Sequence, residues 1–188
     1  MHKKIKSHFA EIFRVLNLFS RDELNFLKLE AVAELIQKVK ESGGKILTIG
    51  HDLSLNNAHY FASSLKNTCN VESRNFTDFS AGNNSEPDYL NFIEAQGAAG
   101  DLLVWFSANQ TPDFFSRIAT KAIETDMIIV LFTGNVRQNT QTEADITVFA
   151  PETPGAVRTI ELQTVMIHAL CDAVHSKLQE IKPNSTEN

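Results

Sequence analysis

Five short apolar runs, separated by longer stretches with helical spacing, constrain the fold of this 188-residue chain most strongly. Runs such as 101–107 and 127–133 carry leucine, valine, isoleucine and phenylalanine at nearly every position rather than at alternate ones. Strands of this kind are buried on both faces, which is typical of parallel sheets covered by helices on each side. The runs therefore predict an α/β fold with a doubly wound, five-stranded parallel sheet.

The predicted elements alternate in the order that such a sheet requires. The predicted strands are 45–50, 71–76, 101–107, 127–133 and 145–150, of which 71–76 has the weakest pattern. The helices predicted to alternate with them are 54–66, 88–96, 112–125 and 157–181. Ligands of such sheets bind beyond the carboxyl ends of the strands, so the turns after Gly50 and Ser107 are the first candidate binding sites.

An N-terminal helix pair, 1–42, precedes the α/β core, 45–181, and a tail, 182–188, completes a single domain. The first helix has apolar residues at steps of three and four, typical of an amphipathic helix: Ile5, Phe9, Ile12, Leu16 and Phe19. A capping-box pattern at 20–23 opens the second helix, which runs to about Glu41. We expect the pair to pack together or on a partner chain, because two helices before a first strand cannot cover the sheet as a crossover helix would.

The last predicted helix is the most regular element. Its heptad-like apolar seam comprises Ile160, Thr164, Ile167, Cys171, Val174, Leu178 and Ile181. Beside the seam lie Glu161, Val165, His168, Asp172 and His175. A seam of this length favours helix–helix packing, including packing across a subunit boundary.

Charge and composition exclude several classes of partner. The net charge of −6 and the pI near 5.5 disfavour binding to nucleic acid or to anionic membranes. The basic cluster at 2–6 is interpreted as a solvated helix start. Cys69 and Cys171 lack the spacing of a metal site, and no apolar run could span a bilayer. We expect a cytoplasmic protein with reduced thiols, without a cofactor or metal.

Three segments together resemble the sugar isomerase (SIS) domain, in the branch of the phosphoheptose isomerases and the DiaA-like proteins. They are GGKILTIGHDLSLNNAHYFASSL, GDLLVWFSANQTPDFFSRIATKAIETDMIIVLFTG and ADITVFAPETPGAVRTIELQTVMIHALCDAV. The resemblance covers nearly the whole chain apart from 68–99. It implies a parallel sheet in flavodoxin-like order, a homodimer or homotetramer, and a sugar-phosphate pocket near a subunit interface.

The two loops that bind phosphate in this family differ here. The first loop, G-N-G-G-S in the isomerases, reads Gly50-His51-Asp52-Leu53-Ser54, and the second, S-T-S-G-N-S, reads Ser107-Ala108-Asn109-Gln110-Thr111-Pro112. The ligand-binding residues that the resemblance implies are Ser54, Ser107, Asn109, Thr111 and Arg158. A phosphate here would face the carboxylates of Asp52 and Asp113, which predicts a pocket poorly suited to phosphate.

The family positions that hold the metal or the acid–base groups are also changed. In the H-F-A-E-E-L motif the histidine is Tyr60 and the acting glutamate is Ser64. In the R-I-Q-E motif the glutamine is Ile160, while Glu161 and the later His168 remain as family remnants. A lone imidazole makes a poor site for a divalent metal.

Other histidines and aromatic residues have simpler interpretations. His51 is expected at a solvent-facing turn, although it could act as a replacement base, and His59 on a polar surface or interface. The aromatic residues Trp105, Phe106, Phe114, Phe115, Tyr89 and Phe92 are expected in the core, with an exposed binding anchor as the alternative.

Three functional hypotheses follow. The first is a non-catalytic, homo-oligomeric, DiaA-like adaptor that binds the replication initiator DnaA. The second is a ketose–aldose isomerase for sedoheptulose 7-phosphate or a related sugar phosphate, with His168 transferring the proton. The third is a sensor of a sugar derivative that binds through Ser54, Asn109 and Ser107. Loss of the acid–base pair favours the first, a protein that is not an enzyme.

Overall fold

The computed structural model describes residues 1–80, 84–108, 112–134, 143–153 and 155–180. One parallel sheet has the strand order β2-β1-β3-β4-β5, as predicted. Its strands are β1 (Ile46–Gly50), β2 (Ser73–Asn75), β3 (Leu102–Ser107), β4 (Ile128–Thr133) and β5 (Ile146–Phe149). The pairing of β3 with β4 runs from Leu102 opposite Ile128 to Ser107 opposite Thr133, so these two strands end side by side.

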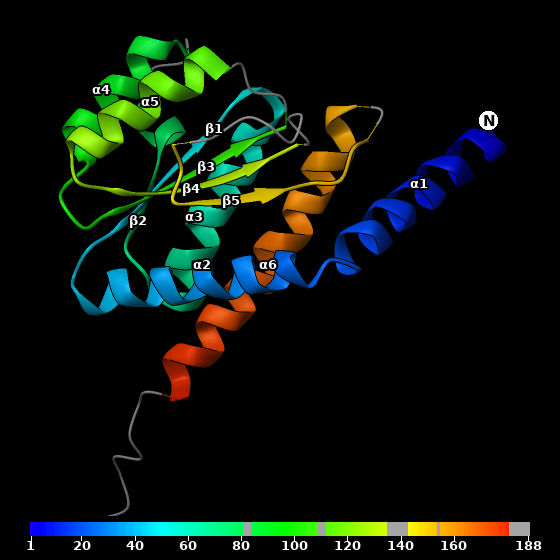
Figure 1. Cartoon of the computed structure of the whole chain (residues 1–188), viewed down its shortest axis with the longest axis horizontal. Helices are drawn as coiled ribbons and strands as arrows, with labels where there is room; N and C mark the ends of the chain where they lie inside the picture. Colours follow the sequence, from blue (N-terminus) through cyan, green and yellow to red (C-terminus); the bar gives the residue numbers. More distant parts are fainter. Residues whose placement is uncertain (81–83, 109–111, 135–142, 154, 181–188) are drawn as a thin grey trace, which may run out of the picture.

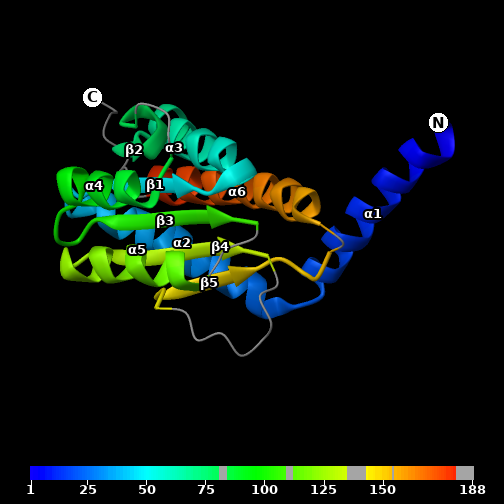
Figure 2. The same cartoon turned by 90° about the horizontal axis from the view of Figure 1, so that it is seen from above.

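Helices cover both faces of the sheet (Figure 1). The α-helices are α1 (His2–Ser20), α2 (Glu23–Glu41), α3 (Leu55–Cys69), α4 (Glu86–Gln96), α5 (Pro112–Glu124) and α6 (Ala156–Glu180). One face carries α4 and α5, and the other carries α2, α3 and α6 (Figure 2). Among the described residues, no helix is both long enough and apolar enough to cross a membrane.

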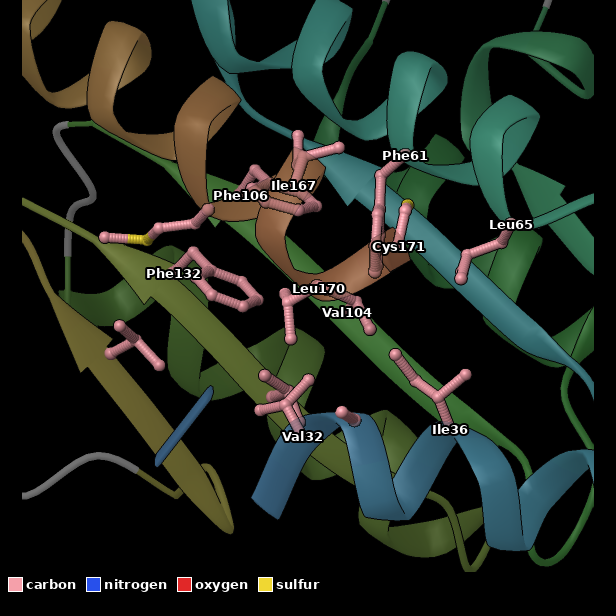
Figure 3. Close-up of a cluster of buried hydrophobic side chains, with 14 of the residues drawn as sticks. Val32, Ile36, Phe61, Leu65, Val104, Phe106, Phe132, Ile167, Leu170 and Cys171 are labelled. Atoms are coloured by element: carbon pink, nitrogen blue, oxygen red, sulfur yellow. The ribbon is translucent and has the colours of Figure 1, made fainter. Parts of the chain in front are cut away.

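Alternate residues of each strand point to opposite faces of the sheet, and both faces are buried. In β3, Val104 and Phe106 point to the core beneath α2, α3 and α6, whereas Leu103 and Trp105 point to the core beneath α4 and α5. Figure 3 shows part of the first core, where Val32, Phe132 and Leu170 come together from α2, β4 and α6. This double burial explains the continuous apolar runs in the sequence.

The N-terminal helix pair behaves differently from the prediction. Helix α2 does cover the sheet: it buries Val32 and Ile36 beside α6 and packs against β5. The prediction that the pair could not cover the sheet is therefore wrong, because α3 and α6 leave room for α2 beside β5. The helix also begins at a different cap, since the Asp22 carboxylate, not Ser20, accepts a hydrogen bond from the backbone N–H of Leu24 at 3.1 Å.

Helix α1 packs on α6 and α2 with its C-terminal half and extends away from the rest of the molecule (Figures 1 and 2). Val15 and Phe19 are buried, but Phe9 and Phe13 are 64% and 69% exposed. On α6, the predicted seam residues Ile167, Cys171 and Val174 are instead buried in the chain's own core.

Candidate active site

The first candidate loop turns tightly from β1 into α3. A Cβ atom on Gly50 would lie 2.4 Å from the carbonyl oxygen of Ser54, so only glycine fits at the end of β1. Asp52 adopts a left-handed conformation with φ of 50°, and its side chain is 76% exposed. His51 is half-buried beside Asp52, with Nε2 3.5 Å from the carboxylate, in keeping with a turn residue.

Ser54 does not face solvent. It is fully buried, and its hydroxyl donates a hydrogen bond to Oε1 of Gln163 on α6 at 3.2 Å. Nδ2 of Asn57, one turn into α3, donates to the same oxygen at 3.3 Å and to the carbonyl of Ile160 at 2.9 Å. The predicted ligand residue Ser54 is therefore part of an internal polar cluster between α3 and α6.

Gln163 is the centre of this cluster and was missed by sequence reasoning. Its Nε2 donates hydrogen bonds to the carbonyls of Ser107 at 3.2 Å and Phe132 at 3.2 Å, at the ends of β3 and β4. Its amide thus connects both strand ends to α3 and α6. In the sequence, Gln163 is visible only as a polar residue next to Leu162 in the last predicted helix.

The second candidate loop begins at Ser107, which is fully buried. Its hydroxyl, and that of the adjacent Thr133, have no hydrogen-bond partner among the described residues. A buried hydroxyl without a partner is costly, by about 1–3 kcal/mol, unless another polar group meets it. The predicted ligand residues Asn109 and Thr111, and the side chains of Asp113 and Phe114, lie outside the described residues.

Arg158, predicted to bind ligand, is buried at the start of α6 and is held by residues of its own chain. Its Nε lies 3.0 Å from the Glu11 carboxylate of α1, Nη1 contacts Glu161, and Nη2 lies 2.5 Å from Nδ1 of His8. The hydrogen bond with Glu161, aided by Glu11, raises the pKa of the Arg158 guanidinium. Within one chain, Arg158 thus links α1 to α6. The family remnant Glu161 is its ion-pair partner on α6.

His168 meets Tyr60 on the exposed surface between α3 and α6. The Tyr60 hydroxyl lies 2.9 Å from His168 Nε2, and the rings are edge-to-face with centroids 5.6 Å apart. Tyr60 is 42% exposed, and His168 is also exposed. The structure therefore brings together Tyr60, which replaces the family histidine, and His168, which is retained. The two residues lie 108 positions apart in the chain.

The remaining family positions supply no further metal ligand. Ser64 and Ile160 are half-buried, and Ile160 has no donor atom in its side chain. In the part of the chain that the structure describes, no three His, Cys, Asp or Glu side chains are grouped so that they could hold a metal ion. The donor set therefore does not fit the metal that the family resemblance implies.

The other predicted surface and core residues are placed as follows. His59 is exposed on α3 and approaches Asp78 at 3.6 Å. The aromatic residues that the structure buries in the core are Trp105, Phe106, Phe115, Tyr89 and Phe92.

Known proteins resemble this chain along nearly its whole length. The phosphoheptose isomerase of Neisseria gonorrhoeae is 27% identical over 198 residues, covering 96% of this chain and 98% of the relative. The phosphoheptose isomerase of Edwardsiella ictaluri is 24% identical over 191 residues, covering 94% of this chain and 97% of the relative. No protein-family model matches.

A solved structure shares the fold. Phosphoheptose isomerase GmhA from Neisseria gonorrhoeae superimposes with a TM-score of 0.78, at 23% identity, over 92% of this chain and 98% of that one. The prediction of a non-catalytic adaptor for DnaA is wrong, because the relatives are named as isomerases and nothing in these comparisons points to a DnaA-binding protein. The changes at the metal and acid–base positions do not by themselves exclude catalysis, because His168 is retained.

Proposed function

We propose that this chain, a phosphoheptose isomerase-like protein with a SIS domain, is a ketose–aldose isomerase that acts on a sugar phosphate such as sedoheptulose 7-phosphate. The proposal is supported by the similarity to phosphoheptose isomerases, which covers 94–96% of the chain. The observation that carries it is the exposed imidazole of His168, a family position for proton transfer, on the surface between α3 and α6.

The reaction needs a base that can remove a proton from the carbon beside a carbonyl group and return it to the neighbouring carbon. Histidine is the side chain best suited to such exchange near neutral pH. His168 is accessible to substrate, whereas the nearest family carboxylate, Glu161, is engaged by Arg158. His168 is therefore the residue to which we assign the proton transfer.

We assign the phosphate end of the substrate to the carboxyl ends of β3 and β4, and this assignment replaces the prediction that Asp52 and Asp113 make the pocket poorly suited to phosphate. Parallel α/β sheets bind ligands at this edge. The buried hydroxyls of Ser107 and Thr133 lie there without partners among the described residues and offer hydrogen bonds to a polar ligand. Asn109 and Thr111, in the same loop region, remain predicted ligand residues.

Deuterium exchange tests the proposal directly. The purified protein is incubated in D₂O with sedoheptulose 7-phosphate and with ketose and aldose phosphates of five to seven carbons, and NMR detects isomerisation and deuterium at C1 or C2. We expect exchange with at least one of these sugars, and a loss of about 100-fold or more in His168→Ala. His59→Ala is the matched control, since His59 is exposed on α3 but contacts Thr77 and Asp78 instead.

Two results would contradict the proposal in different ways. If thermal-shift measurements show binding of a sugar phosphate but no sugar exchanges deuterium, the protein is a sensor of sugar derivatives rather than an isomerase. If His168→Ala exchanges deuterium as fast as wild type, the assignment of the base is wrong.

A further inference from the structure

The contact between Tyr60 and His168 is placed where the family resemblance implies a metal site. The two side chains come from the exposed sides of parallel-running helices, and their polar atoms are 2.9 Å apart. Other contacts already hold these helices together: Thr164 donates to Asn57 at 3.1 Å, and His175 Nδ1 meets the carbonyl of Thr68 at 2.9 Å. The fold therefore has no need of the Tyr60–His168 contact to join α3 to α6.

The chemistry of the donors explains why a metal does not fit here. A neutral phenol is a weak ligand for a divalent metal. Ser64 offers a neutral hydroxyl and Ile160 no donor at all. A single imidazole does not make a site for a divalent metal.

We propose that Tyr60 is a second catalytic residue, which forms with His168 an acid–base pair that isomerises the sugar phosphate without a metal. The inference rests on the proposed function and assigns to Tyr60 the polarisation of the carbonyl oxygen of the substrate. A phenol is suited to that role because it is an O–H donor that also accepts a proton back.

The first half of the reaction converts the aldose to an enediol. When the substrate is bound, the Tyr60 hydroxyl turns from Nε2 of His168 to O1, which leaves Nε2 free. Nε2 then takes the proton from C2, the C2–H electron pair forms a C1=C2 double bond, and the C1=O1 π pair moves to O1. The Tyr60 hydroxyl gives its proton to O1. The products are a neutral enediol, an imidazolium and a phenolate, so no charge is created or lost in total.

The second half restores both side chains. The imidazolium gives its proton to C1, the C1=C2 π pair forms the new C1–H bond, and the O2–H proton goes to the Tyr60 phenolate as C2=O2 forms. One imidazole can serve both carbons because C1 and C2 are bonded neighbours. After the first half of the reaction and before the second, the phenolate and the imidazolium are neighbours. Their opposite charges attract and stabilise each other.

The test compares Tyr60→Phe with wild type after treatment with EDTA, using the substrate identified by deuterium exchange. We expect wild-type kcat to be unchanged by EDTA and by added Zn²⁺. Tyr60→Phe should lower kcat about 100-fold or more while KM changes little, because the phenol acts on the transition state. Phenylalanine preserves the ring, and Tyr60 is partly exposed, so the fold is retained; thermal melting verifies this. His59→Ala again serves as the unaffected control.

A second readout does not depend on activity. ¹⁵N NMR of the His168 ring should change in Tyr60→Phe, because Nε2 loses its hydrogen-bond partner. The inference is overturned if Tyr60→Phe keeps wild-type kcat, if its His168 resonances match wild type, or if EDTA abolishes activity and Zn²⁺ restores it. In each case the isomerase proposal stands. Absence of deuterium exchange by wild type with every sugar phosphate would instead refute the proposed function, and the inference with it.

Discussion

Tyr89 fixes the end of β1 at the candidate site. It is buried on α4, its ring stacks on Phe76 with centroids 4.1 Å apart, and its hydroxyl donates a hydrogen bond to the carbonyl of Gly50 at 2.8 Å. Burial raises the pKa of the Tyr89 phenol to about 12, and the carboxylates of Asp52 and Asp88 add to this. The phenol of the folded protein therefore keeps its proton at a pH where that of the unfolded chain has lost it.

Stability should consequently fall as the pH rises from about 10 to about 12. In this window the unfolded chain releases the Tyr89 proton and the folded protein retains it, so each increase in pH favours unfolding. The contribution lost is at most about 3 kcal/mol. Urea unfolding of wild type and Tyr89→Phe between pH 8 and pH 12 measures it. The variant should be about 1 kcal/mol less stable at pH 8, from the lost hydrogen bond, and should show a shallower decline. If the free energy of unfolding falls equally steeply with pH in wild type and in Tyr89→Phe, the prediction is refuted.

Gln163 should be the most sensitive polar residue in the core of the site. Replacing it with leucine keeps the volume but leaves the carbonyls of Ser107 and Phe132 without their donor. We expect Gln163→Leu to lower the free energy of unfolding by about 2–4 kcal/mol, since each buried unpaired group costs about 1–3 kcal/mol. Chemical denaturation measures the loss. Gln179→Leu, an exposed position on the same helix, should change stability by less than about 0.5 kcal/mol. Similar losses at the two positions would contradict the role of Gln163.

These residues show what sequence can and cannot reveal at this scale. The need for glycine at Gly50 was predictable, because a strand that turns at once into a helix leaves no room for a side chain. The role of Gln163 was not, because its partners come from two strands and α3, far apart in sequence. The Tyr60–His168 contact likewise depends on how α3 and α6 align in space.

At the scale of elements, the strands and the later helices were predictable from apolar patterns, and the role of α2 was not. A buried strand is visible as a continuous apolar run whatever its neighbours are. Whether an amphipathic helix such as α2 covers the sheet or a partner depends on the space left by α3 and α6. That space is a property of the assembled fold, so local pattern could not decide it.

The end of α3 provides an element-scale prediction. Asn70 caps the helix in the left-handed conformation, with φ of 52°, and its backbone N–H donates to the carbonyl of Leu65. Asparagine tolerates this conformation, whereas a β-branched side chain clashes with the backbone. Asn70→Val should therefore destabilise the protein by about 1–2 kcal/mol, and Asn70→Gly should be neutral or slightly stabilising. Thermal and urea unfolding measure both.

The matched control is Asn67→Val, because Asn67 is exposed within the same helix and has ordinary helical geometry. Asn67→Val should lower the free energy of unfolding by only a few tenths of a kcal/mol. If valine is equally tolerated at positions 67 and 70, the left-handed cap does not contribute as argued.

At the scale of the whole molecule, α1 leaves an apolar surface uncovered. Phe9 and Phe13 are exposed on α1, and the N-terminal part of this helix extends from the body (Figure 2). Beside them, a groove of about 380 Å³ between α1, α2 and α6 is lined by Phe13, Phe26 and Met166, among other mostly apolar residues. Apolar surface of this kind marks an interaction site on most proteins. A second copy of the chain offers both a projecting apolar helix and a groove to receive one, so a symmetric pair would cover both.

We therefore predict a homodimer or homotetramer in which α1 of each copy packs beside the groove of another. Light scattering after size-exclusion chromatography should give a multiple of the 21.0 kDa chain mass. Phe9→Asp and Phe13→Asp place a charge in the apolar contact and should each raise the dissociation constant at least about 30-fold. Ser7→Asp adds the same charge about 200° around the helix from Phe9 and should leave the assembly intact. A monomeric wild type, or full assembly of Phe13→Asp, would show that this surface does not join copies of the chain.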